Sequence, residues 1–341
     1  MPLRVGVIHP PSAIEGGRLT LDGTGFPIGG SRLPDVRIGG VPARVVYASP
    51  TRLDVIVPPG ITDGGPQPVR VDGAASGTQA TSFVEVAAPL VTGVHQVDNP
   101  TFDAAGNLYV TYSGTRGEQV PVSIFRVHPD GTRETFSAGI VNPTSTAIGP
   151  DGQLYVSSRF EGVVYRAHPD GAAESFVTDL GVACGLAFAA DGSLLVGDRS
   201  GTIFRVDRSG HATPFATLPG SIAAFHLTFG PDEALYVAGP TLSTHDAIYR
   251  IDADGVVTTR FEGFGRPQGL AFDADGVLFA VEALAGVSGL YRLPEGEAPE
   301  LVLSGPGLIG VAFDPRGGLV VSSNDTVYRL PGDRRPFRLP G

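Results

Sequence analysis

The sequence of 341 residues contains no lysine, because every one of its 24 basic residues is an arginine. Without lysine, the chain cannot form a Schiff base with a carbonyl substrate or use a lysine side chain as a general base. Cysteine is almost absent as well, with Cys184 the single example. One cysteine excludes both an intramolecular disulfide and a cysteine-rich zinc site.

Long apolar runs and basic clusters are also missing. No stretch approaches the roughly 20 apolar residues that span a bilayer, and the N-terminal MPLRVGVIHPPS lacks the apolar segment of a signal peptide. Arg334 and Arg335 form the one basic cluster, and the formal net charge of −11 repels phosphate backbones and anionic lipids. We therefore expect neither nucleic acid nor a membrane as a partner. The expected location is cytoplasmic, or exported if a signal peptide has been removed from the sequence.

The residues that are abundant are typical of an all-β protein. The chain has 48 glycines and 30 prolines, and 42% of its residues are hydrophobic while 17% are charged. A chain this apolar has to bury a core, and frequent glycine and proline favour tight turns between short strands of branched and aromatic residues. The length suits two domains better than one.

Residues 1–88 have the pattern of a small β-sandwich. Alternation between turn signals predicts strands at 16–26, 35–40, 43–49, 52–58, 68–73 and 81–86. This segment resembles the IPT/TIG family of Ig-like domains. The resemblance is carried by Pro11, Gly16-Gly17, LTLDGTGF at 19–26, VRIGG at 36–40, VPPG at 57–60 and Phe83. Such domains usually act as interaction or spacer modules, so the resemblance implies support rather than chemistry, with residues 87–89 as the linker.

A repeat of about 40 residues begins near residue 90. Each repeat has two strands around a tight turn, usually Asp-Gly, at 103–110, 149–156, 189–196, 230–237, 273–280 and 314–321. Each also has an apolar residue, an aromatic residue and an arginine in a row, ending at Arg126, Arg166, Arg205, Arg250, Arg292 and Arg329. With one more strand after each arginine motif, residues 89–341 are predicted to form a six-bladed β-propeller of four-stranded blades.

The six blades are predicted to cover 95–139, 140–179, 180–219, 220–263, 264–304 and 305–341. They resemble the blades of NHL-repeat and gluconolactonase-type propellers, through a GLAF-plus-DG signature at 185–192 and 269–276. The sequence leaves open how the ring closes. Its last strand, around RRPFRL at 334–339, closes it either alone or together with LVTGVH at 90–95.

Strand parity places the tight turns on one face of the propeller and the variable loops on the other, where ligands are expected. On this loop side, His226 occupies a position that is mostly small or glycine in the other repeats. Asp198 and Glu282 end the second strands of the two flanking blades, so the three side chains are predicted to meet at the channel mouth. His226 would then act as a general base. The alternative interpretation is that these residues are solvated or form hydrogen bonds at strand ends.

The gluconolactonase resemblance implies a divalent cation such as Ca2+ at the channel mouth, with Asp198 and Glu282 as its candidate ligands. The LFAVE run that ends at Glu282 also resembles a strand of virginiamycin-lyase-like propellers. Further binding residues predicted at the mouth are Arg159, Arg199, Cys184, His245, Gln268 and Asn324. His245 and the EALAGVSG run at 282–289 are candidates for a lid or specificity loop.

Two functions follow from these patterns, and a purely structural spacer in a larger assembly is a third alternative. The first is a binding protein, whose propeller rim holds a small molecule, a glycan or a protein, with no cofactor established. The second is a metal-dependent lactonase, another hydrolase or a lyase acting at the channel mouth. The sequence favours binding, because the metal ligands typical of gluconolactonases are missing at the positions where the pattern would place them.

Overall fold

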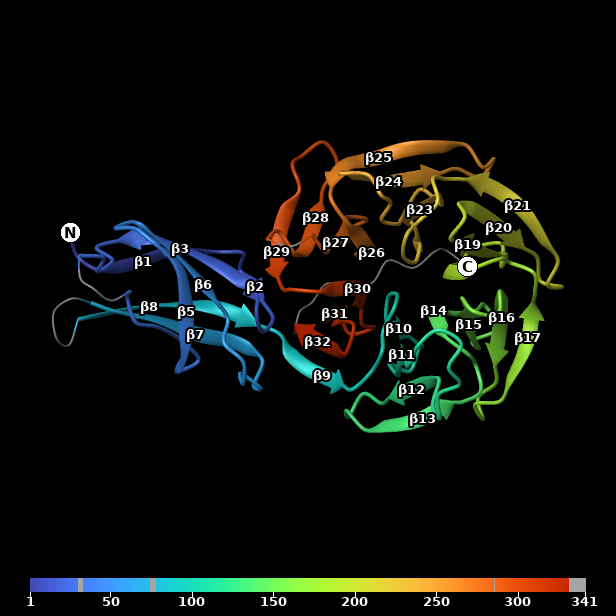
Figure 1. Cartoon of the computed structure of the whole chain (residues 1–341), viewed down its shortest axis with the longest axis horizontal. Coiled ribbons are helices and arrows are strands. Elements are labelled where there is room, and N and C mark those ends of the chain that lie inside the picture. The colour runs from blue at the N-terminus through green and yellow to red at the C-terminus, as the bar shows by residue number, and fades with distance from the viewer. Residues whose placement is uncertain (30–32, 74–77, 285, 331–341) are drawn as a thin grey trace.

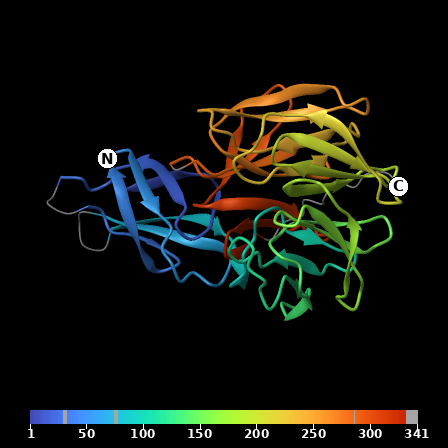
Figure 2. The same ribbon diagram turned by 45° about the vertical axis from the view of Figure 1, so that its right-hand side comes forward.

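The structure is a computed structural model that describes residues 1–29, 33–73, 78–284 and 286–330 (Figure 1). Strands make up all the regular secondary structure in these ranges, so the all-β prediction is confirmed. No helix in the described part of the chain is long and apolar enough to cross a membrane. A small sandwich of strands lies beside a larger ring of four-stranded sheets, as both ribbon views show (Figures 1 and 2).

Eight strands form the N-terminal domain. They are β1 (Arg4–His9), β2 (Ser12–Ala13), β3 (Arg18–Thr24), β4 (Val36–Ile38), β5 (Val41–Ala48), β6 (Arg52–Ile56), β7 (Gly65–Asp72) and β8 (Gln79–Val86). Alternation buries one side of each strand: in β7, Val69 and Val71 are fully buried and Arg70 between them is exposed. The strands pair in the order β1-β3-β6-β5-β4-β7-β8, and β1 contacts β8 across the core. β1 and β2 were not predicted, because Gly6 and the prolines after β1 are poor strand residues.

From residue 88 onward, the described residues form a ring of blades around a central axis, seen face on in Figure 1. Five separate four-stranded sheets are present among the described residues. The first has β10 (Thr101–Phe102), β11 (Leu108–Thr111), β12 (Ile124–Val127) and β13 (Arg133–Ser137). The second has β14 (Pro143–Ile148), β15 (Leu154–Ser158), β16 (Val163–Ala167) and β17 (Ala173–Val177). The third has β18 (Ala183–Phe188), β19 (Leu194–Asp198), β20 (Thr202–Val206) and β21 (Ala212–Thr217).

The remaining two separate sheets follow the same order from the inside outward. One has β22 (His226–Phe229), β23 (Leu235–Ala238), β24 (Asp246–Ile251) and β25 (Val257–Phe264). The other has β30 (Leu308–Phe313), β31 (Leu319–Ser323), β32 (Thr326–Leu330) and β9 (Ala88–Thr92). The β-propeller prediction is therefore confirmed at the level of the architecture.

The predicted number of six separate blades is corrected to five. The strands expected to form the remaining blade are β26 (Pro267–Phe272), β27 (Leu278–Glu282), β28 (Gly289–Leu293) and β29 (Glu300–Ser304). They pair in order, but they belong to a twelve-stranded sheet that continues into the N-terminal domain. The cause is β2, which is two residues long and pairs in parallel with both β8 and β29.

Backbone contacts hold the N-terminal domain against β29. The N–H of Ile14 donates to the Ser304 carbonyl oxygen (3.0 Å), and the N–H of Arg18 donates to the Ser304 hydroxyl (2.8 Å). Gly17 approaches so closely that a Cβ atom there would lie 2.4 Å from the Ser304 carbonyl oxygen. The Ile14 side chain is buried in the same apolar core as Phe279 of β27. The two domains therefore share a packed interface as well as a sheet.

The last sheet of the ring is completed by a strand from the start of the propeller. β9 pairs antiparallel with β32 as its outermost strand, with Val91 opposite Val327. Of the two closure modes that the sequence leaves open, the structure therefore shows the one in which part of 90–95 takes part, through β9. The RRPFRL run at 334–339 lies outside the described residues. The predicted domain boundary, between residues 88 and 89, falls inside β9.

The six repeated arginines form ion pairs within their own repeats. The partners lie in the tight turn or on the fourth strand: Arg126 with Glu134, Arg166 with Asp151, Arg205 with Asp191, Arg250 with Asp232, Arg292 with Glu300 and Arg329 with Asp314. In five of these pairs both side chains remain partly exposed, so each of the five contributes only about 0.2–1 kcal/mol. In the sixth pair, Asp314 is 4% exposed. These ion pairs give the repeated arginines a structural role.

Candidate ligand site at the propeller mouth

The two ends of the propeller strands differ in their connections. One end carries short turns, such as the turn closed by the hydrogen bond from the Gly152 N–H to the Gly149 carbonyl oxygen (2.9 Å). We call this end the tight-turn face. The other end, the loop-rich face, carries longer connections, including 112–123 between β11 and β12 and 239–245 between β23 and β24.

His226 is the centre of a buried hydrogen-bond chain at the propeller axis. Its Nδ1 lies 2.5 Å from Asp98 Oδ1, and its Nε2 lies 2.9 Å from Gln268 Oε1. His226 begins β22, Gln268 lies in β26 and Asp98 precedes β10, so three sheets meet at these side chains. His226 is completely buried and Asp98 is 3% exposed. The imidazole is therefore not accessible to a ligand in this conformation.

The residues around this chain allow the inner strands to approach one another. A Cβ atom at Gly310 would lie 2.7 Å from the Asp98 carbonyl oxygen. Asn99 bridges two inner strands: its side-chain amide donates to the Leu270 carbonyl oxygen (3.0 Å), and its Oδ1 accepts the Val311 N–H (3.0 Å). A cavity of about 350 Å³ runs along the inner strands from Asp98 toward their tight-turn ends. The channel thus contains a cavity on the tight-turn side, and the buried Asp98 lies at one end of it.

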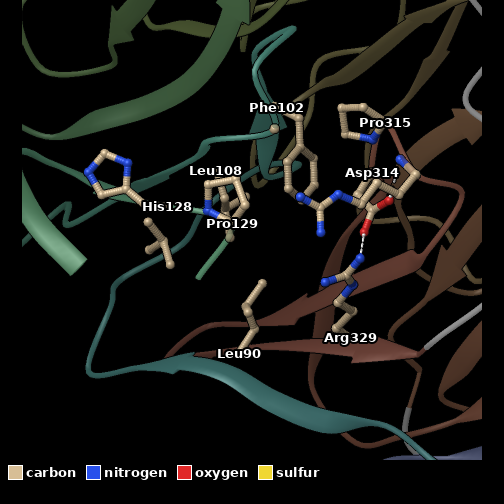
Figure 3. A pocket seen from close by; sticks show the side chains of 11 residues that line it. Leu90, Phe102, Leu108, His128, Pro129, Asp314, Pro315 and Arg329 are labelled. Atoms are coloured by element: carbon tan, nitrogen blue, oxygen red, sulfur yellow. Dashed lines mark hydrogen bonds and ion pairs between the residues drawn. The ribbon is translucent and has the colours of Figure 1, made fainter. Parts of the chain in front are cut away.

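A second cavity, of about 30 Å³, lies between the first and last sheets of the ring (Figure 3). Leu90, Phe102 and Leu108 form its apolar side, and the ion pair of Arg329 with Asp314 lies at its edge. A volume of this size holds about one or two water molecules. It is therefore too small for a ligand.

Asp198 and Glu282 do not join His226. The Asp198 carboxylate accepts hydrogen bonds from the Val182 N–H (2.8 Å) and from the Ser200 hydroxyl. The Glu282 carboxylate accepts three backbone N–H groups, from residues 265, 266 and 284, at 2.7, 2.9 and 2.7 Å. Both carboxylates order the loops next to them, which is the strand-end role that the alternative interpretation described.

The divalent cation implied by the gluconolactonase resemblance does not fit these carboxylates. Divalent cations need carboxylate oxygens that can coordinate them directly, and the oxygens of Asp198 and Glu282 already accept hydrogen bonds from their own loops. Among the described residues, no group of three or more His, Cys, Asp or Glu side chains is arranged to hold a metal ion. Metal binding remains an expectation from the resemblance alone.

Arginines gather on the loop-rich face near the axis. Arg159 follows β15 and Arg199 follows β19, which are the second strands of neighbouring sheets. Burial lowers the pKa of Arg159 below its ordinary value, and the positive charges of Arg199 and Arg116 lower it further. The positive charge of Arg159 also acts on His95. Burial lowers the pKa of His95, and Arg159 lowers it further. None of these three arginines forms an ion pair with any residue that the structure describes.

Two partly exposed aromatic rings accompany these arginines. Tyr112 is 36% exposed and meets His95 edge-on, with ring centroids 6.4 Å apart. Phe160 follows Arg159 directly and is 52% exposed. Guanidinium groups bind carboxylates and phosphates, and aromatic rings cover apolar ligand parts. This combination is suited to a small organic anion.

The other predicted site residues lie in different environments. Cys184 is 1% exposed, and burial raises its pKa to about 12, so the thiol is not set up as a nucleophile. Gln268 belongs to the buried chain around His226. His245 and Asn324 are exposed on the loop-rich face, where the Asn324 carbonyl oxygen accepts the Gln96 N–H (2.8 Å). The structure brings together two pairs of the predicted residues: His226 with Gln268 inside the protein, and Arg159 with Arg199 on the loop-rich face.

Asp98, Asn99 and Arg116 were not identified as site residues from the sequence. A signal for the first two does exist: they form a polar pair directly before a first strand, where three other repeats carry glycine at the second position. Arg116 has no such signal, because it lies in the long loop after β11 and aligns with no repeat position.

Comparison with known proteins supports the two-part architecture. The IPT/TIG domain family matches residues 4–84, which confirms the Ig-like resemblance of the N-terminal domain. No curated protein matches the sequence. Among solved structures, a gluconolactonase from Xanthomonas campestris is similar with a TM-score of 0.59 and 16% identity, covering 85% of this chain and 94% of that one.

Two further structures resemble the chain at similar levels. An auxiliary nutrient binding protein from Bacteroides thetaiotaomicron has a TM-score of 0.56 and 14% identity, covering 97% of this chain and 98% of that one. Virginiamycin B lyase from Staphylococcus aureus has a TM-score of 0.52 and 19% identity, covering 79% and 96%. Identities this low show the fold alone. The structural neighbours thus include a lactonase, a lyase and a binding protein, and the NHL character of the repeats remains a prediction.

Proposed function

We propose that this chain is a binding protein whose propeller holds a small organic anion at its loop-rich face. The observation that carries the proposal is the pair Arg159 and Arg199. The two positive charges are close enough to repel each other, and neither arginine forms an ion pair with any described residue. Arg159 is half-buried, and a positive charge withdrawn from water without a partner is costly. An anion at this site removes that cost, and each charge-assisted hydrogen bond contributes about 1.5–3 kcal/mol.

We propose in addition that β26–β29 acts as a sixth blade of the ring. β26 contacts β22 on one side and β30 on the other, so the inner strands follow one another around the axis. Asn99, which precedes β10, hydrogen-bonds to residues of both β26 and β30. The N-terminal domain is attached beside this blade rather than over the axis (Figure 1). In this arrangement it supports the ring without covering the mouth.

Catalysis by a lactonase, hydrolase or lyase mechanism has weaker support than binding. His226 is completely buried, and both of its ring nitrogens contact side chains of the protein. Asp198 and Glu282 are occupied by their own loops. A general base has to reach a substrate proton directly or through one water molecule, and neither route is available to His226 in this conformation.

Calorimetric titration of the full chain with citrate and with inorganic phosphate, at low ionic strength, tests the anion site. We expect at least one of the two to bind. Arg159→Gln and Arg199→Gln should each weaken that binding about tenfold or more, because a tenfold change corresponds to about 1.4 kcal/mol and each loses at least one charge-assisted hydrogen bond.

Arg208→Gln is the matched control, since Arg208 is an exposed arginine in the turn after β20 on the tight-turn face. It should leave the affinity unchanged. Binding of citrate alone would assign a carboxylate ligand, and binding of phosphate alone would assign a phosphate. If neither anion binds, or if all three variants weaken binding equally, the proposal is wrong.

A further inference from the structure

The groove between the two domains is a third cavity, separate from the propeller mouth and from the two cavities inside the ring. Its volume is about 1020 Å³, at the upper end of the roughly 300–1,000 Å³ typical of small-molecule pockets. One wall is the outer surface of β3, β5 and β6 in the N-terminal domain. The other wall is formed by β29 and by residues of the loop after β27 and of the turn at 304–307. The loop predicted as a specificity element therefore borders this groove.

Three arginines share the wall from the N-terminal domain. Arg18 of β3 and Arg44 of β5 are both paired with Ile56 of β6, which lies between them. The three residues therefore form one row across the sheet. Arg52 lies on the same face of β6 as Ile56, because alternate residues of a strand point to the same side. All three arginines line the groove.

The positive charge of this wall is only partly neutralised. Arg18 and Arg52 pair with one carboxylate, that of Asp54, at 2.5 and 2.8 Å. Burial acts to raise the pKa of Asp54, but hydrogen bonds from Arg52, Arg18 and Thr20 lower it overall, so Asp54 is ionised at neutral pH. One carboxylate cannot balance two guanidinium groups. Arg44 is exposed and has no ion pair with any described residue.

The opposite wall adds little negative charge. Among the described residues that line the groove, Glu300 is the one acidic residue. It forms an ion pair (3.6 Å) with Arg292, which lies outside the groove. The remaining lining is made of proline, glycine, serine and aliphatic residues such as Val287 and Leu301. No Phe, Tyr or Trp is among the described lining residues. Nucleobases are commonly bound by stacking on aromatic rings, and sugar rings often are as well, so a wall without them favours a different ligand.

We propose that the interdomain groove binds an extended acidic peptide segment. The arginines recognise its carboxylates, with Arg44 as the principal contact because no carboxylate of the described protein occupies it. The aliphatic residues of the propeller wall cover the apolar parts of the peptide. This site is independent of the anion site at the propeller mouth, because the two share no residue.

Fluorescence anisotropy with a labelled hexaglutamate peptide, on the full chain at low ionic strength, tests this proposal. Wild-type protein should bind the peptide, and added salt should weaken binding because the contacts are electrostatic. Arg44→Glu should weaken binding at least tenfold. Arg70→Glu is the matched control, because Arg70 is an exposed arginine of the same domain on β7, outside the groove. It should change the affinity less than twofold.

A variant of the other wall distinguishes a groove from a basic patch. Val287 is 47% exposed and belongs to the propeller wall, so Val287→Asp should be tolerated by the fold and should weaken peptide binding at least fivefold. Arg159→Gln should have no effect on the peptide, which separates this site from the propeller mouth. The proposal is overturned if hexaglutamate does not bind, if Val287→Asp binds like wild type, or if an anionic oligosaccharide such as heparin binds where the peptide does not.

Discussion

The hydrogen bond between His226 and Asp98 should be the strongest single coupling in the propeller. Its nitrogen–oxygen distance is 2.5 Å, and the two side chains are 0% and 4% exposed. The ion pair of Arg250 with Asp232 has almost the same distance, 2.6 Å, but its side chains are 33% and 36% exposed. The two pairs therefore differ mainly in burial, and water screens the second one far more than the first.

A double-mutant cycle for each pair, with alanine substitutions, measures this difference. Networks of residues in contact show coupling energies of about 0.5–3 kcal/mol, and we expect the axial pair near the upper end, at about 2–3 kcal/mol. The exposed pair should give about 0.2–1 kcal/mol. The single substitution His226→Ala should also destabilise the protein strongly, because it leaves Asp98 buried without this partner.

Urea unfolding monitored by circular dichroism provides the assay, since the chain contains no tryptophan for fluorescence. The slope of the unfolding free energy against urea has to be equal among variants, so that the differences report stability and not a change in the unfolded state. If the axial coupling is no larger than the exposed coupling, then burial does not strengthen the contact between His226 and Asp98. The hydrogen bonds around His226 would then not hold the three sheets together.

Three further predictions concern other parts of the chain. Cys184 is buried with its pKa raised to about 12, so Ellman's reagent at mildly alkaline pH should modify it in concentrated guanidinium and not in the folded protein. Burial raises the pKa of Tyr155 and Tyr165 to about 12 from about 10 in the unfolded chain. Their stabilising contribution is complete below pH about 10 and is lost as the pH rises from about 10 to 12, so urea midpoints should fall over this range; a flat midpoint would contradict it. Deleting residues 90–95 removes most of β9 and should lower hydrogen-exchange protection in β32 more than in β16; equal loss in both strands would show that β9 is not the closing strand.

Local patterns in the sequence were sufficient to predict a β-sandwich followed by a propeller of four-stranded units. Alternation of apolar and polar residues predicted six of the eight strands of the N-terminal domain, and the recurring turns and arginine motifs predicted the repeated four-stranded units. Both signals depend on a few neighbouring residues, because side chains alternate along a strand and tight turns need glycine, aspartate or proline. The pairing of each repeated arginine with a carboxylate of its own repeat is local for the same reason.

The site and the domain arrangement depend instead on contacts between distant residues. His226 meets Asp98 across 128 residues of sequence, and that contact exists only because the ring brings the starts of β10 and β22 to one axis. β2 joins β29 although 286 residues separate Arg18 from Ser304 at the same junction, and no periodicity in the sequence marks this pairing. The sequence alone identified His226 as unusual among the repeats and predicted Arg159 and Arg199 at the channel mouth. Only the closed tertiary structure decided that the histidine is buried between protein partners while the arginines remain open to a ligand.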